Sequence, residues 1–214
     1  MKPQRPTLKP IKQATRIGTD VVLHFKDDKE KPMICRSIRG GLTFPVEDQT
    51  GYLLVAGQLP QMNKHRKYPI VVFREAQAAL PETLFNHLID AARGLLCWDF
   101  FTDLTMDTSE LYDMLEDFLM LRDMTRISLE PPPVTDWNVA VLMLQQWINE
   151  GSLFIPDGMY LHNELRGMTV EDRLNAAKVK LPGANALRCV VSSFLQPQTM
   201  AMAGTVQPGA YKYD

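Results

Sequence analysis

The pattern of apolar residues changes once along the chain, and this change restricts the possible folds more than any other feature of the sequence. Residues 20 to 80 hold short runs of β-branched and aromatic residues, separated by charged or glycine-containing turns. Those runs are VVLHF (21–25), PMICRSI (32–38), LTFPV (42–46), YLLVAGQ (52–58) and YPIVVFREA (68–76). They predict a strand meander in which Arg39, Gly40 and Gly41 form a flexible turn.

After residue 80 the apolar residues recur at helical spacing. Helices are expected at 80–96, 109–124, 137–150 and 184–195, with a further one through Leu161, Leu165 and Met168. Two strand-like runs, TRISLE (125–130) and LFI (153–155), separate them, and three prolines end the first run. The acidic run 98–121, which includes Asp99 and Asp103, fits a metal site or, as is more common, the solvent face of an amphipathic helix, and the second interpretation is preferred. Strands followed by strand–helix alternation favour an α/β domain with a mixed sheet and helices on its faces.

Both ends of the chain are expected to lie outside that domain, which is placed at 18–195. Residues 1–17 carry only basic charges and three prolines, so they predict a basic N-terminal arm without regular structure. Residues 196–214 carry prolines, glycines and little charge, which predicts an extended C-terminal tail.

Composition argues against several classes of protein. A net charge of −2 gives no global basic field, and no apolar run is long enough to span a membrane. The three cysteines lie far apart and fit neither a zinc site nor a disulfide framework, as expected for a cytoplasmic protein with reduced thiols. The chain contains no phosphate-binding loop, dinucleotide fingerprint, nucleophile elbow or zinc-protease motif.

Carboxylates at strand ends are the remaining candidates for chemistry. A two-metal phosphodiester site needs several carboxylates that converge on hard cations. Glu75, Glu130, Asp136 and Glu164 are the candidates, although each alone could be a surface or capping residue. Asp136 in particular is explained by capping of the helix that follows it.

Taken in order, the elements from about residue 34 to 195 resemble the RNase H-like nuclease domain of the phage terminase large subunit, which cuts DNA during packaging. The segment INEGSLFIPDGMYLHNELRGMTVED (148–172) is similar to the late part of those domains, where a helix runs into a glycine, a short strand and another helix. The segment GANALRCVVSSFL (183–195) resembles their final helix, which typically reads Asp-Ala-Leu-Arg. The ATPase half of that family has no counterpart in this sequence.

Departures from the family pattern decide what the resemblance implies for the site. The family's first metal-binding Asp has no counterpart in ICRSIRGGLTFP (34–45). Its second acid matches Glu130, and its third acid is replaced by Asn185. The resemblance therefore implies a metal site of Glu130 and Asn185 that has lost most of its charge. No cofactor is expected unless other acids substitute, in which case the cofactor is Mg²⁺ or Mn²⁺.

Three functions remain open, and the balance favours the two that are not enzymatic. The first is a terminase-like pseudo-nuclease that acts as a DNA-handling or assembly module in DNA packaging. The arm and four basic residues would contact DNA or an acidic partner in the host cytoplasm or the virion; these residues are Arg39, Lys64, Arg66 and Lys67. The second is an active Mg²⁺- or Mn²⁺-dependent DNA endonuclease that uses Glu130, Glu75 and Asp48 or Glu47. The third is a virion or adaptor protein whose arm and tail dock on other phage assembly proteins.

Overall fold

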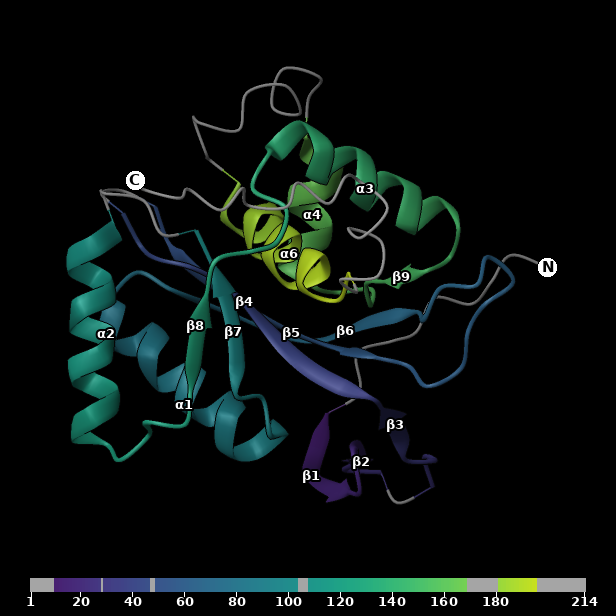
Figure 1. Ribbon diagram of the computed structural model, residues 1–214, viewed down its shortest axis with the longest axis horizontal. Coiled ribbons are helices and arrows are strands. Elements are labelled where there is room, and N and C mark those ends of the chain that lie inside the picture. The colour runs from purple at the N-terminus through teal and green to yellow at the C-terminus, as the bar shows by residue number, and fades with distance from the viewer. Residues whose placement is uncertain (1–9, 28, 47–48, 104–107, 169–180, 196–214) are drawn as a thin grey trace, which may run out of the picture.

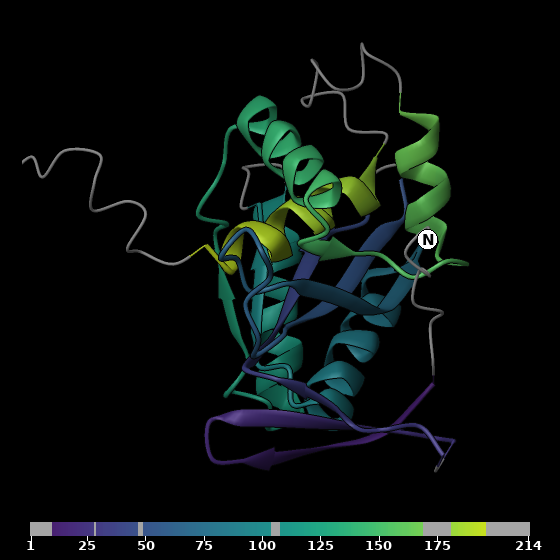
Figure 2. The ribbon, with the colours of Figure 1, turned by 90° about the vertical axis from the view of Figure 1, so that its right-hand side faces the viewer.

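The computed structural model describes residues 10–27, 29–46, 49–103, 108–168 and 181–195. The chain begins with a small antiparallel sheet of β1 (Ile11–Ile17), β2 (Asp20–Phe25) and β3 (Met33–Cys35). This small sheet lies beside one end of the larger sheet, as Figure 2 shows. Val21, Leu23 and Cys35 connect it to the main apolar core.

A six-stranded mixed sheet forms the centre of the molecule, with the order β8-β7-β4-β5-β6-β9 (Figure 1). Its strands are β4 (Ser37–Thr43), β5 (Gly51–Gln58), β6 (Ile70–Ala78), β7 (Asp99–Thr102), β8 (Ser128–Glu130) and β9 (Leu153–Phe154). The β4-β5 and β5-β6 pairs are antiparallel. The β4-β7, β7-β8 and β6-β9 pairs are parallel. The mixed sheet predicted from the order of strands and helices is confirmed.

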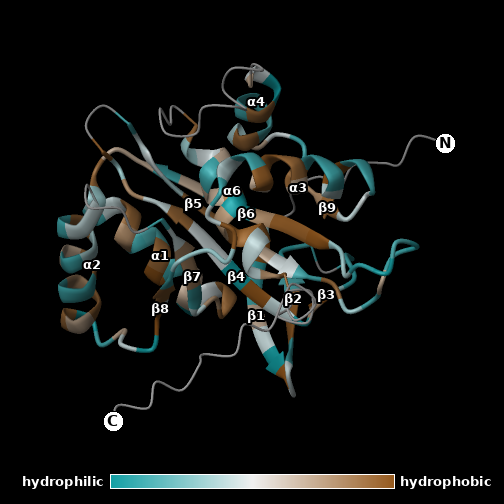
Figure 3. Ribbon diagram, turned by 45° about the horizontal axis from the view of Figure 1, so that its top comes forward, coloured by the Kyte–Doolittle hydropathy of each residue, from teal (hydrophilic) through white to brown (hydrophobic). Residues whose placement is uncertain are grey.

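Helices cover both faces of the large sheet. One face packs against α1 (Pro81–Leu95) and α2 (Ser109–Leu121), and the other against α3 (Trp137–Asn149), α4 (Tyr160–Gly167) and α6 (Pro182–Ser193). Two apolar clusters result, because alternate residues of β5 face opposite layers: Leu53 belongs to one cluster and Leu54 to the other. Figure 3 shows β5 and β6 as hydrophobic strands between these layers.

Three local expectations need correction. Residues 11–17 form β1 rather than an unstructured arm, because all three prolines, at 3, 6 and 10, precede the strand. Residues 39–41 lie inside β4 rather than in a turn. The acidic run contains a strand, β7, before its helix begins at Ser109. The expected tail at 196–214 lies outside the described residues.

Capping of α3 follows the sequence prediction. The Asp136 side chain accepts a hydrogen bond from the backbone N–H of Val139 at 3.0 Å, as a helix N-cap does. Asp136 is therefore committed to helix capping. Among the described residues, no helix is long and apolar enough to cross a membrane.

Candidate functional site

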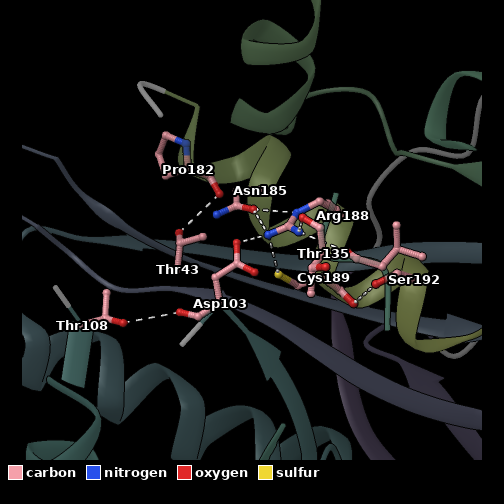
Figure 4. Close-up of polar contacts among 10 residues, drawn as sticks. Thr43, Asp103, Thr108, Thr135, Pro182, Asn185, Arg188, Cys189 and Ser192 are labelled. Atoms are coloured by element: carbon pink, nitrogen blue, oxygen red, sulfur yellow. Dashed lines mark hydrogen bonds and ion pairs between the residues drawn. The ribbon is translucent and has the colours of Figure 1, made fainter. Parts of the chain in front are cut away.

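The C-terminal ends of β4 and β7 meet at one edge of the large sheet, beneath the first turns of α6. The parallel β4-β7 ladder ends at the pair Leu42 and Thr102, so Thr43 and Asp103 follow side by side. The Thr43 hydroxyl donates to the backbone carbonyl of Pro182, at the start of α6, at 3.3 Å. Figure 4 shows Thr43 and Asp103 facing this helix. Ligands in open α/β sheets gather at such strand ends, so this edge is the candidate site.

Arg188 of α6 is the centre of a hydrogen-bond network at this edge (Figure 4). Its side chain is 3% exposed, and its Nη2 forms an ion pair with the Asp103 carboxylate. Its Nε and Nη2 donate to the side-chain oxygen of Asn185 at 2.9 and 2.7 Å. Its Nη1 donates to the backbone carbonyls of Val134 and Thr135 at 3.1 and 2.9 Å. One side chain thus joins β7, the segment before α3, and α6.

The hydrogen bonds of this network use all the N–H donors of Arg188. A guanidinium has five N–H donors, and the protein acceptors around Arg188 occupy all of them. Arg188 therefore has no N–H left for a phosphate. The Asn185 oxygen, which was predicted as a metal ligand, instead accepts two N–H bonds from Arg188. The Asp103 charge is balanced by a fixed internal cation.

Close packing leaves no room for a side chain at Gly40 or Gly41 of β4, which lies within the segment 34–45 where the resemblance expects the family's first Asp. A Cβ at Gly41 would overlap the backbone carbonyl of Ala186 in α6, and a Cβ at Gly40 would overlap the ring of Phe100. The two glycines let α6 and β7 approach the strand closely. Neither glycine can therefore be replaced by a residue with a side chain unless α6 or the ring of Phe100 moves.

Of the predicted catalytic residues that the structure describes, only Glu130 lies at this edge, and Glu75 lies elsewhere. Glu130 ends the parallel edge strand β8, beside Phe101 of β7, where it is exposed and one strand further from β4 than Asp103. The acid next to the end of β4 is Asp103, which the sequence analysis did not single out. The strand-like run Phe100-Phe101-Thr102 before it was the available signal, but it was hidden in the acidic run. Asp48 lies outside the described residues.

Glu75 and Glu164 hold the N-termini of two helices. The Glu75 carboxylate accepts from the backbone N–H groups of Tyr160 at 2.6 Å and Leu161 at 3.2 Å, at the start of α4. It also accepts from the hydroxyl of the buried Tyr52. Glu164 of α4 in turn accepts from the first N–H groups of α6, Gly183 at 3.1 Å and Ala184 at 2.6 Å. Both carboxylates satisfy helix donors that have no partner within their own helix.

Burial raises the pKa values of two groups in these contacts, the Glu164 carboxyl and the Tyr52 hydroxyl. It raises the pKa of Glu164, and the nearby Glu75 charge adds to the rise, while the N–H groups of Ala184 and Gly183 oppose it. Burial and the hydrogen bond to Glu75 also raise the pKa of the Tyr52 hydroxyl, which therefore stays protonated. Glu75 and Glu164 act here as acceptors for the N–H groups of α4 and α6.

The raised pKa of Glu164 predicts a pH-dependent contribution to stability. Between the unfolded and folded pKa values the native state binds more protons than the unfolded state, so this contribution is present at low pH and is lost as pH rises through the folded value. In Glu164→Gln it should be absent. We expect the unfolding free energy of the wild type, relative to Glu164→Gln, to fall from about pH 4 to about pH 7 in urea titrations.

Glu164→Ala provides the matched comparison. It leaves the N–H groups of Gly183 and Ala184 without their acceptor, which should cost about 1–3 kcal/mol at either pH. A difference between wild type and Glu164→Gln that grows as pH rises would contradict the direction of this shift.

Of the four predicted DNA-contacting residues, Arg39 and Lys67 are engaged by other side chains of the protein, whereas Lys64 and Arg66 are exposed. Arg39 donates to the carbonyl of Ser193 and lies over the rings of Phe101 and Phe194, at 5.7 and 5.2 Å. It is therefore part of the packing beneath the end of α6. Lys67 pairs with Glu150 at 2.6 Å and lies 5.1 Å from the Trp147 ring centre.

Lys64 and Arg66 are exposed in the turn between β5 and β6. Asn63 orders this turn, because its side-chain oxygen accepts from the N–H groups of His65 and Lys67 at 2.9 and 3.1 Å. Arg66 has a positive φ of 58°, a conformation that the ordered turn maintains. The turn lies at the opposite end of β5 from Thr43, about 20–25 Å along the strand.

The described donors at the candidate edge do not fit a hard divalent cation. Within the part of the chain that the structure describes, no three His, Cys, Asp or Glu side chains are grouped as a metal site. The described carboxylate next to β4, Asp103, is paired with Arg188, and the Asn185 oxygen accepts from the same guanidinium. Hard cations need several free oxygen ligands, and the described residues at this edge do not supply them.

Comparisons with known proteins bear on the fold. No protein-family model matches this chain, and no curated protein matches it. The crystal structure of the large terminase nuclease from the thermophilic phage G20c is similar, with a TM-score of 0.50 at 14% identity, over 88% of this chain and 94% of that one.

Two further solved structures align less well. The nuclease domain of the large terminase g2p from bacteriophage SPP1 with bound Mn gives a TM-score of 0.37 at 15% identity, over 61% of this chain and 68% of that one. The fowlpox virus Holliday junction resolvase gives 0.40 at 8% identity, over 77% of this chain and 99% of that one.

Proposed function

We propose that this chain, which has the RNase H-like nuclease fold that its sequence resembles, is a catalytically degenerate DNA-handling module that binds DNA without cutting it. The observation that carries the proposal is the ion pair of Arg188 with Asp103 at the end of the central strands. Metal-dependent phosphodiester cleavage needs converging carboxylates that are free to bind cations. Here the guanidinium of Arg188 pairs with one oxygen of the Asp103 carboxylate and neutralises its charge.

DNA contact in this proposal comes from the ordered turn between β5 and β6. Lys64 and Arg66 are exposed there and have no acidic partner among the interactions that the structure shows, whereas Lys67 is neutralised by Glu150. Phosphate contacts by such residues bind DNA without sequence preference. The proposal also places the protein in phage or prophage DNA packaging, in the host cytoplasm or the virion, beside other assembly proteins.

A metal titration followed by a cleavage assay tests the catalytic half of the proposal. We expect calorimetry with Mn²⁺ to show no binding that depends on Glu130, and plasmid DNA in the same samples to remain uncut. Glu130→Gln should behave as the wild type, because the proposal assigns no metal or catalytic role to Glu130, although it ends β8 at the candidate edge. Mn²⁺-dependent cleavage that is lost in this variant would replace the proposal with the alternative, an active endonuclease that uses Glu130, Glu75 and Asp48.

Fluorescence anisotropy with a labelled duplex tests the DNA half. The double variant Lys64→Ala and Arg66→Ala should weaken binding about tenfold or more and reduce the slope of log affinity against log salt by about 2. The charge-matched control is Lys26→Ala with Lys29→Ala, in the exposed turn between β2 and β3, which should leave affinity nearly unchanged. Equal losses in both variants would show a diffuse electrostatic effect, and an absence of binding by the wild type would leave an assembly role.

A further inference from the structure

Helix α3 ends beside the turn that the proposed function assigns to DNA, and it brings an acid to that turn. Residues 59–69, between β5 and β6, contain no acid and four residues that are or can become cationic: Lys64, His65, Arg66 and Lys67. Glu150 is the C-cap residue of α3, and its Oε2 accepts from the Lys67 ammonium at 2.6 Å. A side chain from another element therefore reduces the positive charge of this turn.

The Glu150 carboxylate is held in this place from two sides. Its Oε2 pairs with Lys67, and its Oε1 accepts from the side-chain N–H of Gln146 at 2.7 Å. The hydrogen bonds from Lys67 and Gln146 lower the pKa of Glu150, and the charge of His65 adds to this, so the carboxylate is ionised at neutral pH. The side chains of Lys67 and Glu150 are 27% and 20% exposed. The pair thus lies at the surface, where a phosphate can approach the ammonium.

Lys67 is also positioned by contacts that do not involve Glu150. Its ammonium lies 5.1 Å from the centre of the Trp147 ring, a cation–π contact. Its backbone N–H donates to the Asn63 side-chain oxygen at 3.1 Å, and the Asn63 amide donates to the hydroxyl of the buried Ser152 at 2.7 Å. The turn and the ammonium should therefore stay in place when Glu150 loses its charge.

We propose that Glu150 limits the DNA affinity of this turn, because its carboxylate occupies on Lys67 the position that a backbone phosphate would take. The inference rests on the proposed function and concerns the regulation of the same surface. Carboxylates and phosphates both accept charge-assisted hydrogen bonds from an ammonium. While Glu150 stays paired, Lys67 displaces no counterion from DNA, and the contacts come from Lys64 and Arg66. Removal of the acid adds a third cation for phosphate beside these two.

Fluorescence anisotropy with the full-length protein and a labelled duplex tests this inference. Glu150→Gln keeps the shape of the side chain and removes its charge. We expect its affinity to rise about fivefold to tenfold at about 0.1 M salt, and the slope of log affinity against log salt to steepen by about 1, because Lys67 becomes available to a phosphate. Lys67→Met with Glu150→Gln removes both charges of the pair, so it should bind as the wild type does.

Glu116→Gln is the matched control for net charge. Glu116 is exposed on α2, which covers the opposite face of the sheet from α3, so its loss should change affinity by less than about twofold. An equal gain in Glu116→Gln and Glu150→Gln would show a diffuse effect of net charge and would overturn the inference.

The same assay separates this inference from the proposed function. Unchanged or weaker binding by Glu150→Gln, with a wild type that binds DNA through Lys64 and Arg66, would overturn the inference and leave the proposed function standing. Binding by Glu150→Gln but not by the wild type would support the inference and contradict DNA binding by the native chain. If neither protein bound DNA, both proposals would fail.

Discussion

Arg188→Met is expected to lower the unfolding free energy by about 3–5 kcal/mol, one of the two largest effects that the structure predicts. The substitution keeps much of the side-chain volume but removes the cation paired with Asp103. It also leaves the Asn185 oxygen and the carbonyls of Val134 and Thr135 without their donors. Urea unfolding followed by circular dichroism and by tryptophan fluorescence measures this loss and checks that the two probes agree.

Two further variants separate the charge of Arg188 from its shape. Arg188→Lys keeps the charge but cannot reproduce the planar set of five donors, so we expect an intermediate loss. Combining Arg188→Met with Asp103→Asn should cost less than the sum of the two single substitutions, because the unpaired charge is then removed. If Arg188→Met cost no more than an ordinary surface substitution, about 0.5 kcal/mol, the network would not hold the sheet edge and α6 together.

Gly41→Ala should destabilise the protein by about 3 kcal/mol or more, the second large effect. The added Cβ would overlap the carbonyl oxygen of Ala186 and lie 3.0 Å from the backbone nitrogen of Val190. Both atoms belong to the backbone of α6, which cannot rotate away as a side chain can, so the helix must move off the sheet. The unfolding free energy in urea reports the loss, and the melting temperature should fall with it.

Gly94→Ala is the matched control for this substitution. Gly94 lies inside α1 with no heavy atom within 4 Å of the added Cβ, and its φ is not positive. Alanine there should stabilise the protein by about 0.5–1 kcal/mol through helix propensity. Equal small effects of both substitutions would show that α6 does not rest directly on β4.

Much of the fold could be predicted from local patterns. The alternating and helical periodicities located most strands and helices, and the capping role of Asp136 followed from its place before α3. The strand β7 was missed because its four residues lie in an acidic run that also contains α2. The whole of β1 was missed, because the prolines before it dominated the composition of residues 1–17.

The candidate site could be predicted only in part. Asn185 and the lack of an acid in β4 were visible in the sequence, through the resemblance to a nuclease family. The network around Asn185 was not visible, because Arg188 connects Asn185 with Asp103, and Asp103 lies 85 positions before Arg188 in the sequence. Glu75 was a reasonable catalytic candidate from its place in a strand. Its contacts with Tyr160 and Leu161 depend on the position of α4 in the tertiary structure.

The sequence by itself determined the class of fold, because periodicity records which side of each element is buried and needs no knowledge of the partner element. It also determined that β4 carries no acid. Only the tertiary structure decided which groups meet at the end of β4. The β4-β7 ladder places Asp103 beside Thr43, and the two glycines of β4 let α6 come close enough for Arg188 to reach Asp103. Such contacts depend on the register and spacing of distant segments, which no local pattern contains.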